Sequence, residues 1–220
     1  MPRSHGYYPI GLSLAGRPCL IVGGGAVAQR KVRALLRYGG QVTVISPTAT
    51  ATLRRWARAG MIRYRPRTFR ASDVAAQWLV YGATNNPHTQ RAIFSAAQRR
   101  RLLVNIVDEP ALCSFIAPAQ VKRGDLTIAI STGGRAPGLA KRVRQDVERA
   151  IGPEYGKLLR VLERARPAVR KAVPTADDRK RVLSRLVEGG ILEQFRRGRD
   201  HAARRKARQL LRQALQEWGD

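Results

Sequence analysis

Residues 19–31 read CLIVGGGAVAQRK, and this stretch decides the fold. A short apolar run of strand length leads into three consecutive glycines, and a sequence of helical character follows. Glycine loses more backbone entropy on folding than any other residue, so three in succession indicate a turn with special backbone requirements. The segment GGGAVA fits the pattern G-x-G-x-x-G/A, placed after a strand and at the start of a helix.

This pattern predicts a turn that binds a dinucleotide. The first glycine forms the tight turn, the second lets the backbone approach a pyrophosphate, and the small Ala28 lets the helix pack closely. Free N–H groups and the helix dipole both favour a phosphate at that helix start. The predicted cofactor contacts are Gly23, Gly24, Gly25, Ala26 and Val27. A glycine turn with only a structural purpose is the alternative.

Strands and helices alternate through the first half of the chain. Residues 41–46, 61–65, 78–84 and 102–108 are expected to form strands. Helices are expected from Ala26 to the Gly39–Gly40 pair, over 52–60 and over 87–101. This alternation predicts an α/β fold, a Rossmann-like parallel sheet with helices on both faces.

The pattern changes after Pro110. Segments 115–121 and 126–132 flank KRGD at 122–125, which predicts an antiparallel hairpin, and a helix is expected over 137–151. Beyond Gly152 the sequence is helical and polar, with breaks expected at Pro167, Pro174 and Gly189–Gly190.

The charge balance is strongly basic, with 42 Lys and Arg against 15 Asp and Glu, a net +27. The excess is +18 in residues 1–159 and +9 in residues 160–220, so it is spread along the chain. Such a field attracts polyanions, although no helix-turn-helix, zinc or RNA-binding motif is present. A solvated basic surface, an anionic small ligand and nucleic acid are all compatible with the composition.

The remaining composition indicates a soluble cytoplasmic protein that does not enter membranes. No apolar run approaches the roughly 20 residues that span a bilayer, and the N-terminus lacks a signal-peptide pattern. Cys19 and Cys113 are expected to be buried free thiols in a reducing compartment. His5, His88 and His201 form no ligand pattern, so no metal site is predicted.

The end of the second predicted strand departs from the usual dinucleotide pattern. It reads Ser46-Pro47-Thr48, where an acidic residue would bond the ribose 2′-hydroxyl, and no acid occurs between Lys31 and Asp73. Ser46 or Thr48 could bond the ribose, while Arg54 or Arg55 could accommodate a 2′-phosphate. NAD and NADP therefore both remain compatible with these residues.

Five segments carry a resemblance to a known family. They are YYPIGLSLAGRPCLIVGGGAVAQRK at 7–31, YGATNN at 81–86, VNIVDEP at 104–110, SFIAPA at 114–119 and ISTGGRAPGLAKRVR at 130–144. Over roughly residues 7–155 the chain resembles the precorrin-2 dehydrogenases of siroheme biosynthesis, the family that includes the N-terminal module of siroheme synthase. The resemblance implies a homodimer that oxidises precorrin-2 to sirohydrochlorin with NAD. In some members ferrous iron is also inserted.

The resemblance also implies a domain plan and residue roles. It divides the chain into an NAD-binding domain (1–113), a dimerisation segment (114–151) and a C-terminal helical region (152–220). Further cofactor contacts fall on Ser46, Pro47, Thr48, Thr84, Asn85, Asn105 and Val107. Substrate contacts fall on Ser114, Ser131, Thr132, Gly133, Arg135 and Arg142. No metal ligands and no nucleic-acid partner are implied.

Asp108 is the catalytic residue that the resemblance implies, within Asn105-Ile106-Val107-Asp108. Its position favours the same role independently, because ligands bind at the carboxyl ends of strands in open α/β sheets. A carboxylate there is a suitable base for a proton that leaves the substrate. A plain ion-pair partner in a basic chain is the alternative for Asp108.

The basic charge would suit precorrin-2, which carries eight carboxylates. Arg135, Lys141, Arg142 and Arg144 are candidates for binding them, and each is also explained as part of a solvated face. Two other functions compete with this one. The first is a non-catalytic, dinucleotide-sensing module whose basic helices bind nucleic acid. The second is a dehydrogenase of an unrelated small acid, which the matching segments between 104 and 119 disfavour.

Overall fold

The computed structural model describes residues 6–218. Within it the chain forms two compact units, one ending at Ala117 and the other beginning at Pro118. His5, one of the three histidines without a ligand pattern, lies outside the described residues. Among the described residues, no helix has both the length and the apolar character needed to cross a membrane.

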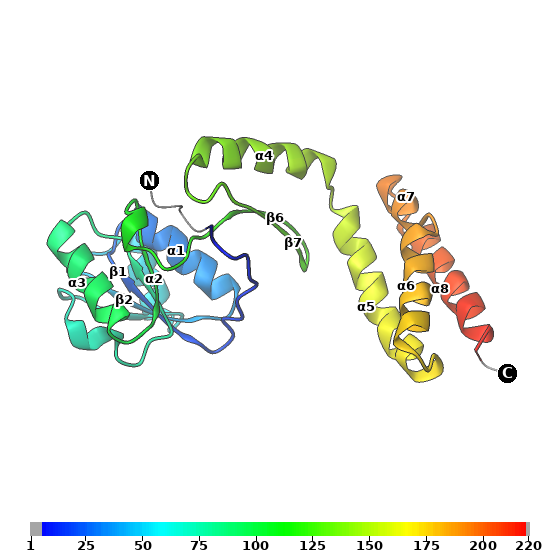
Figure 1. Cartoon of the computed structure of the whole chain (residues 1–220), viewed down its shortest axis with the longest axis horizontal. Coiled ribbons are helices and arrows are strands. Elements are labelled where there is room, and N and C mark those ends of the chain that lie inside the picture. Colours follow the sequence, from blue (N-terminus) through cyan, green and yellow to red (C-terminus); the bar gives the residue numbers. More distant parts are fainter. Residues whose placement is uncertain (1–5, 219–220) are drawn as a thin grey trace. The chain divides into compact units, whose positions relative to one another are not determined.

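The first unit is built on a five-stranded parallel sheet (Figure 1). Its strands are β1 (Pro18–Val22), β2 (Gln41–Ile45), β3 (Arg63–Arg65), β4 (Leu79–Gly82) and β5 (Leu103–Ile106), in the order β3-β2-β1-β4-β5. The chain runs outward from β1 to β3 on one side and from β4 to β5 on the other. The point of reversal lies between β1 and β4, where open α/β sheets have a ligand crevice at the carboxyl edge.

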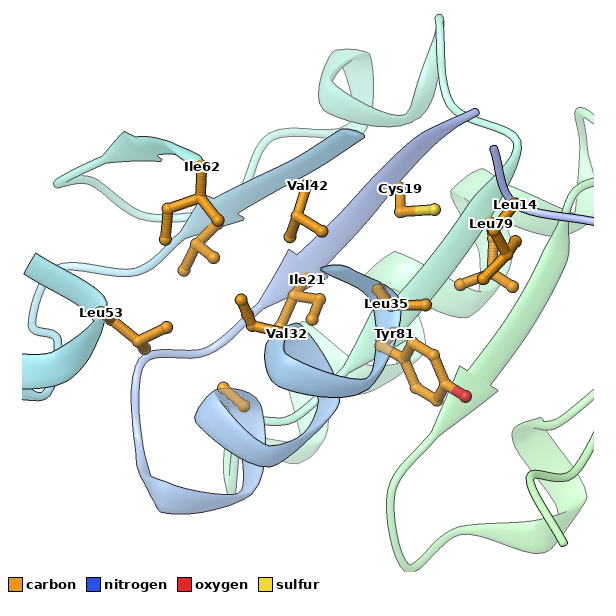
Figure 2. Packing of buried hydrophobic residues seen from close by; sticks show 12 residues of the cluster. Leu14, Cys19, Ile21, Val32, Leu35, Val42, Leu53, Ile62, Leu79 and Tyr81 are labelled. Carbon is orange, nitrogen blue, oxygen red and sulfur yellow. The ribbon is translucent and has the colours of Figure 1, made fainter. Parts of the chain in front are cut away.

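Helices cover both faces of this sheet, as the alternating sequence predicted. Helices α1 (Ala26–Arg37) and α2 (Ala51–Arg58) pack on one face, and α3 (Pro87–Gln98) packs on the other. Successive residues of β1 point to opposite faces, so Ile21 joins the core under α1 while Leu20 joins the core under α3. Figure 2 shows Ile21 facing Val32 of α1. Two short 3₁₀ helices, η1 (Ala71–Val74) and η2 (Pro110–Leu112), complete the unit.

The predicted hairpin opens the second unit. Strands β6 (Ala119–Arg123) and β7 (Leu126–Ile130) pair antiparallel around Gly124, whose φ is +64°. Helix α4 (Pro137–Ala150) packs beside them. The Arg123 guanidinium donates to the carbonyls of Glu148 and Ile151, both at 2.7 Å, and so ties the hairpin to the end of α4. Residues 115–118 precede the strand rather than belonging to it.

Four further helices form a bundle: α5 (Glu154–Ala172), α6 (Ala176–Glu188), α7 (Ile191–Arg196) and α8 (Asp200–Gln216) (Figure 1). Their core contains Leu158, Leu186, Ile191 and Phe195. The helix breaks predicted at Pro174 and Gly189–Gly190 are confirmed. The break predicted at Pro167 is wrong, because α5 continues through this exposed residue. The turn at Gly198, between α7 and α8, was not predicted.

Candidate dinucleotide and catalytic site

The glycine turn after β1 is closely surrounded by backbone. Gly23 has φ +127°, and a Cβ there would overlap the carbonyl oxygen of Ala83. A Cβ on Gly24 would overlap the carbonyl oxygen of Thr48. Gly25 differs, because nothing lies within 4 Å of the position that its Cβ would take. The first two glycines are therefore required by the protein itself, whereas the third leaves open space above the helix start.

That open space suits a phosphate group. Gly25 is the N-cap of α1, and no side chain accepts a hydrogen bond from the first turn of this helix among the described residues. The uncapped N–H groups at Ala26 and Val27 are the donors that a pyrophosphate uses in dinucleotide-binding folds. The residues present therefore fit the cofactor that the sequence predicted.

The structure places Ser46, Pro47 and Thr48 beside the glycine turn. The Thr50 N–H donates to the carbonyl of Gly24 at 3.0 Å, which holds the 46–50 loop against it. Ser46 is buried, while Pro47 and Thr48 are exposed. No carboxylate belongs to this loop, so any ribose contact from it comes from hydroxyl and backbone groups.

The residues after β4 form the other wall of the crevice. The Ala83 N–H donates to the carbonyl of Val22 at 2.7 Å and so joins the ends of β4 and β1. Thr84 follows, with its carbonyl accepting a hydrogen bond from Gln90 at 2.8 Å. Asn85 is exposed, and Asn86 caps α3 by accepting from the N–H of Thr89 at 3.0 Å. The structure thus brings Thr84 and Asn85 to the same edge as the glycines.

Asn105 and Val107 fix the end of β5 internally. The buried Asn105 side chain donates from Nδ2 to the carbonyl of Phe115 at 2.9 Å. The Val107 N–H donates to the carbonyl of Gly82 at 2.9 Å. Ser114 also has a structural bond, since its hydroxyl accepts from the N–H of Val104 at 2.9 Å. These bonds set the position of the residue that follows, Asp108.

Asp108 has an unusual backbone at the carboxyl edge of the sheet. Its φ is +64°, and within residues 6–218 the other non-glycine residue with positive φ is Arg101. Left-handed backbone costs energy for L-residues and is found preferentially at functional positions. The side chain is exposed, and no basic group of the described residues forms an ion pair with it within 4.0 Å. The arrangement does not favour the ion-pair alternative for Asp108.

A lysine that the sequence analysis did not single out lies near this carboxylate. Lys31 of α1 is half-buried, and its Nζ lies 4.8 Å from the centroid of the Tyr81 ring. Burial lowers the pKa of Lys31, the charge of Arg30 lowers it further, and Cys113 and Asp108 act in the opposite direction. Its position between buried Ala28 and Val32 could have indicated a side chain directed toward the sheet.

Tyr81 and Cys113 complete the surroundings of Lys31. The Tyr81 ring meets Phe115 edge to face, with centroids 5.4 Å apart, and burial raises the pKa of its hydroxyl. Figure 2 shows the Tyr81 ring beside α1. The Cys113 thiol donates to the carbonyls of Ile106 and Glu109, and burial raises its pKa. Cys113 is half-buried rather than buried as expected, whereas Cys19 is buried, and both thiols are free.

The remaining predicted substrate residues belong to the second unit. In the turn after β7, Ser131 Oγ accepts from the Gly133 N–H at 3.1 Å, and Thr132 Oγ1 accepts from the Ala136 N–H at 3.2 Å. Arg135 is exposed. On α4, Arg142 pairs with Asp146 at 3.3 Å and Arg144 pairs with Glu148. The substrate roles of these residues stay predictions.

Three family models match the chain. Residues 10–119 match a putative NAD(P)-binding family, residues 123–150 match the central region of sirohaem biosynthesis proteins, and residues 154–211 match the sirohaem synthase dimerisation region. The fold and its glycine turn thus define a Rossmann-type NAD(P)-binding protein with an attached dimerisation region. The last match covers the helices, C-terminal to the 114–151 segment expected to serve dimerisation.

Similar proteins place the chain more narrowly. It is 37% identical over 209 residues to siroheme synthase of Thioalkalivibrio sulfidiphilus, and 40% identical over 217 residues to siroheme synthase of Methylococcus capsulatus. These alignments cover 95% and 97% of the chain but 43% and 46% of the two relatives, so the chain spans just under half their length. A solved structure described as SirC, precorrin-2 dehydrogenase, superposes with a TM-score of 0.79 at 25% identity, over 94% of this chain and 98% of that one. The chain belongs to the family that comprises the N-terminal module of siroheme synthase and the precorrin-2 dehydrogenases.

Proposed function

We propose that the protein oxidises precorrin-2 to sirohydrochlorin with NAD, within siroheme biosynthesis. The observation that carries the proposal is the geometry of Asp108, a carboxylate that forms no ion pair within 4.0 Å among residues 6–218 and lies on left-handed backbone at the same sheet edge as the dinucleotide turn. The likeness to a precorrin-2 dehydrogenase over nearly the whole of both chains supports the same activity.

The reaction removes two electrons and two hydrogens from the macrocycle. One hydrogen leaves as hydride and the other as a proton, so precorrin-2 and NAD⁺ give sirohydrochlorin, NADH and H⁺. NAD, when bound, supplies the hydride acceptor. Asp108 accepts the proton and releases it to solvent, to which its side chain is exposed.

The other residues of the crevice bind and orient the reactants. Gly25, Ala26 and Val27 hold the pyrophosphate, and Ser46 with Thr48 contacts the ribose. Thr84, Asn85, Asn105 and Val107 shape the wall between the cofactor and Asp108. Within the second unit, roles in binding substrate carboxylates are proposed for Ser131, Thr132, Gly133, Arg135 and Arg142. Within the first unit, a substrate contact is proposed for Ser114, whose hydroxyl accepts from the N–H of Val104.

The assembly that we propose is a cytoplasmic homodimer. The match to a dimerisation region supports self-association. We retain the boundaries 1–113, 114–151 and 152–220 for the NAD-binding domain, the hairpin segment and the helical region, and the dimerisation match falls on the helical region. Membranes and nucleic acid are not among the proposed partners.

A second candidate activity is the insertion of ferrous iron, which the name siroheme synthase of the similar proteins favours. Among the described residues, no cluster of three or more His, Cys, Asp or Glu side chains could hold a metal ion. Iron would therefore be a substrate passed to the macrocycle, with Asp108 accepting the pyrrole protons. Sirohydrochlorin and ferrous iron, mixed without air and without NAD, test this step against the uncatalysed rate.

The decisive experiment mixes the purified protein with precorrin-2 and NAD and follows the absorbance of sirohydrochlorin and NADH. We expect both to form together in equal amounts. Binding of NAD without turnover, combined with salt-sensitive binding of duplex DNA, would support the regulatory alternative instead. Turnover of small hydroxy acids in place of precorrin-2 would support the other competing function.

A further inference from the structure

We propose that Lys31 binds a carboxylate of the tetrapyrrole substrate and so orients the macrocycle over Asp108. The inference rests on the proposed function. It assigns a role to Lys31, a charged side chain that takes part neither in the proposed binding of the dinucleotide nor in the proposed proton transfer to Asp108. It concerns the first unit alone.

The first step is the unsatisfied charge of Lys31. Lys31 is half-buried, and within residues 6–218 no carboxylate lies within 4.0 Å of its ammonium. Removing a cation from water is costly without a partner of opposite charge. The Tyr81 ring at 4.8 Å offsets part of this cost through its negative face. An incoming anion would offset more of it.

The second step is that the residues packed beneath Lys31 are held rigidly. Tyr81 is 5% exposed, lies in β4, and is paired in register with Asn105 of β5. Phe115 packs against the Tyr81 ring, and the backbone of Phe115 is held by the Asn105 side chain. The platform under Lys31 therefore belongs to β4, and it is held by β5, the neighbouring strand that precedes Asp108. A substrate bound to Lys31 would be aligned by a strand that is paired with the one presenting the base.

The third step identifies the anion. The pyrophosphate site is at Gly25, and Lys31 lies six residues further along α1, about 9 Å along the helix axis at 1.5 Å per residue. Its electrostatic neighbours are Arg30 on its own helix and Cys113 and Asp108, and the last two belong to the catalytic end of the crevice. Precorrin-2 carries carboxylates around its ring, so a carboxylate can reach Lys31 while the ring faces Asp108. The substrate, rather than the cofactor, is the anion that this position favours.

The test compares Lys31→Met, which keeps the apolar stem, with Lys31→Arg, which keeps the charge. Arg30→Met is the matched control, because it removes the same charge from the adjacent, exposed position. Sirohydrochlorin is titrated without NAD and its absorbance followed, NAD is titrated by calorimetry, and precorrin-2 turnover is measured separately. All variants are checked for folding by circular dichroism.

We expect Lys31→Met to weaken sirohydrochlorin binding at least about tenfold, as for a lost charge-assisted hydrogen bond, and to raise KM more than it lowers kcat. Lys31→Arg should retain most of the affinity, and Arg30→Met should change it by less than about threefold. Affinity for NAD should be unchanged. Equal tetrapyrrole affinity in Lys31→Met and Arg30→Met would overturn the inference, as would a parallel loss of NAD affinity. If the wild type binds sirohydrochlorin but does not oxidise precorrin-2, the proposed function fails while the titrations still decide the role of Lys31.

Discussion

At the scale of single residues, Asp108→Asn removes the proposed catalytic carboxylate and keeps the backbone conformation at this position. Asparagine, like aspartate, tolerates positive φ, so the +64° conformation is retained. We expect precorrin-2 turnover to fall at least about 100-fold, the lower range for loss of a positioned general base, with NAD affinity nearly unchanged. Steady-state kinetics and calorimetry measure the two effects. The neighbouring acid gives the control, Glu109→Gln, and near wild-type turnover in Asp108→Asn would contradict the assignment.

Substitutions at Gly23 and Gly25 of the same turn are expected to differ in their effect on the melting temperature. Gly23→Ala places a Cβ against the Ala83 carbonyl at φ +127°, so even this small change, and Gly23→Val more strongly, should lower the melting temperature together with NAD affinity. Gly25→Ala meets no protein atom and should leave the melting temperature nearly unchanged, while its Cβ enters the predicted pyrophosphate space. Thermal denaturation and NAD titration distinguish them. Unaltered NAD affinity in Gly25→Ala would mean that the turn is only structural.

At the scale of the element, α5 contains a proline that weakens it. Pro167 lacks the N–H that would bond the preceding turn, and its exposed ring contributes little burial. Pro167→Ala is expected to raise the free energy of unfolding by about 1–3 kcal/mol. Pro137, at the start of α4, is the control because proline is well tolerated there. Chemical denaturation gives both values, and a destabilised Pro167→Ala would show that the ring has a packing role.

Asp73 at η1 makes the first unit sensitive to acid. The hydrogen bonds from Arg67 lower the pKa of its 3% exposed carboxyl, burial opposes them, and the Arg70 N–H adds to the lowering. A depressed pKa stabilises the fold above the unfolded value of about 3.9, and this stabilisation is lost as the pH falls through the lower folded value. Asp73→Asn should therefore cost about 1.5–3 kcal/mol at neutral pH and progressively less as the pH falls below about 3.9. Denaturation from pH 7 to pH 3 checks this against exposed Asp125→Asn, and a difference that does not depend on pH would contradict it.

The elements also show why some features could be predicted from the sequence and others could not. Local patterns were sufficient for the sheet, the glycine turn and the hairpin, because the spacing of apolar residues and glycines determines them. The helix through Pro167 was missed because packing of buried Ala165 and Val169 outweighs the local cost of proline. Lys31 was missed because its significance depends on Tyr81, fifty positions away, which only the register of the sheet brings beneath it.

At the scale of the whole molecule, the charge of +27 should act on the rate of encounter with an octacarboxylate. We expect kcat/KM for precorrin-2 to fall several-fold between low and physiological salt, where the screening length is about 8 Å. The turnover number at saturating substrate should change much less, which provides an internal control. A kcat/KM that does not respond to salt would leave the charge as a solvated basic surface.

The left-handed backbone at Asp108 has a consequence for interpreting variation among natural sequences. Two independent requirements restrict the amino acid at position 108. The left-handed backbone admits chiefly glycine, asparagine and aspartate, and the proposed chemistry requires a carboxylate. Aspartate alone satisfies both. A homologue with asparagine or glycine at this place would keep the architecture and lose the base, which is the signature of a pseudoenzyme recognisable from a single letter.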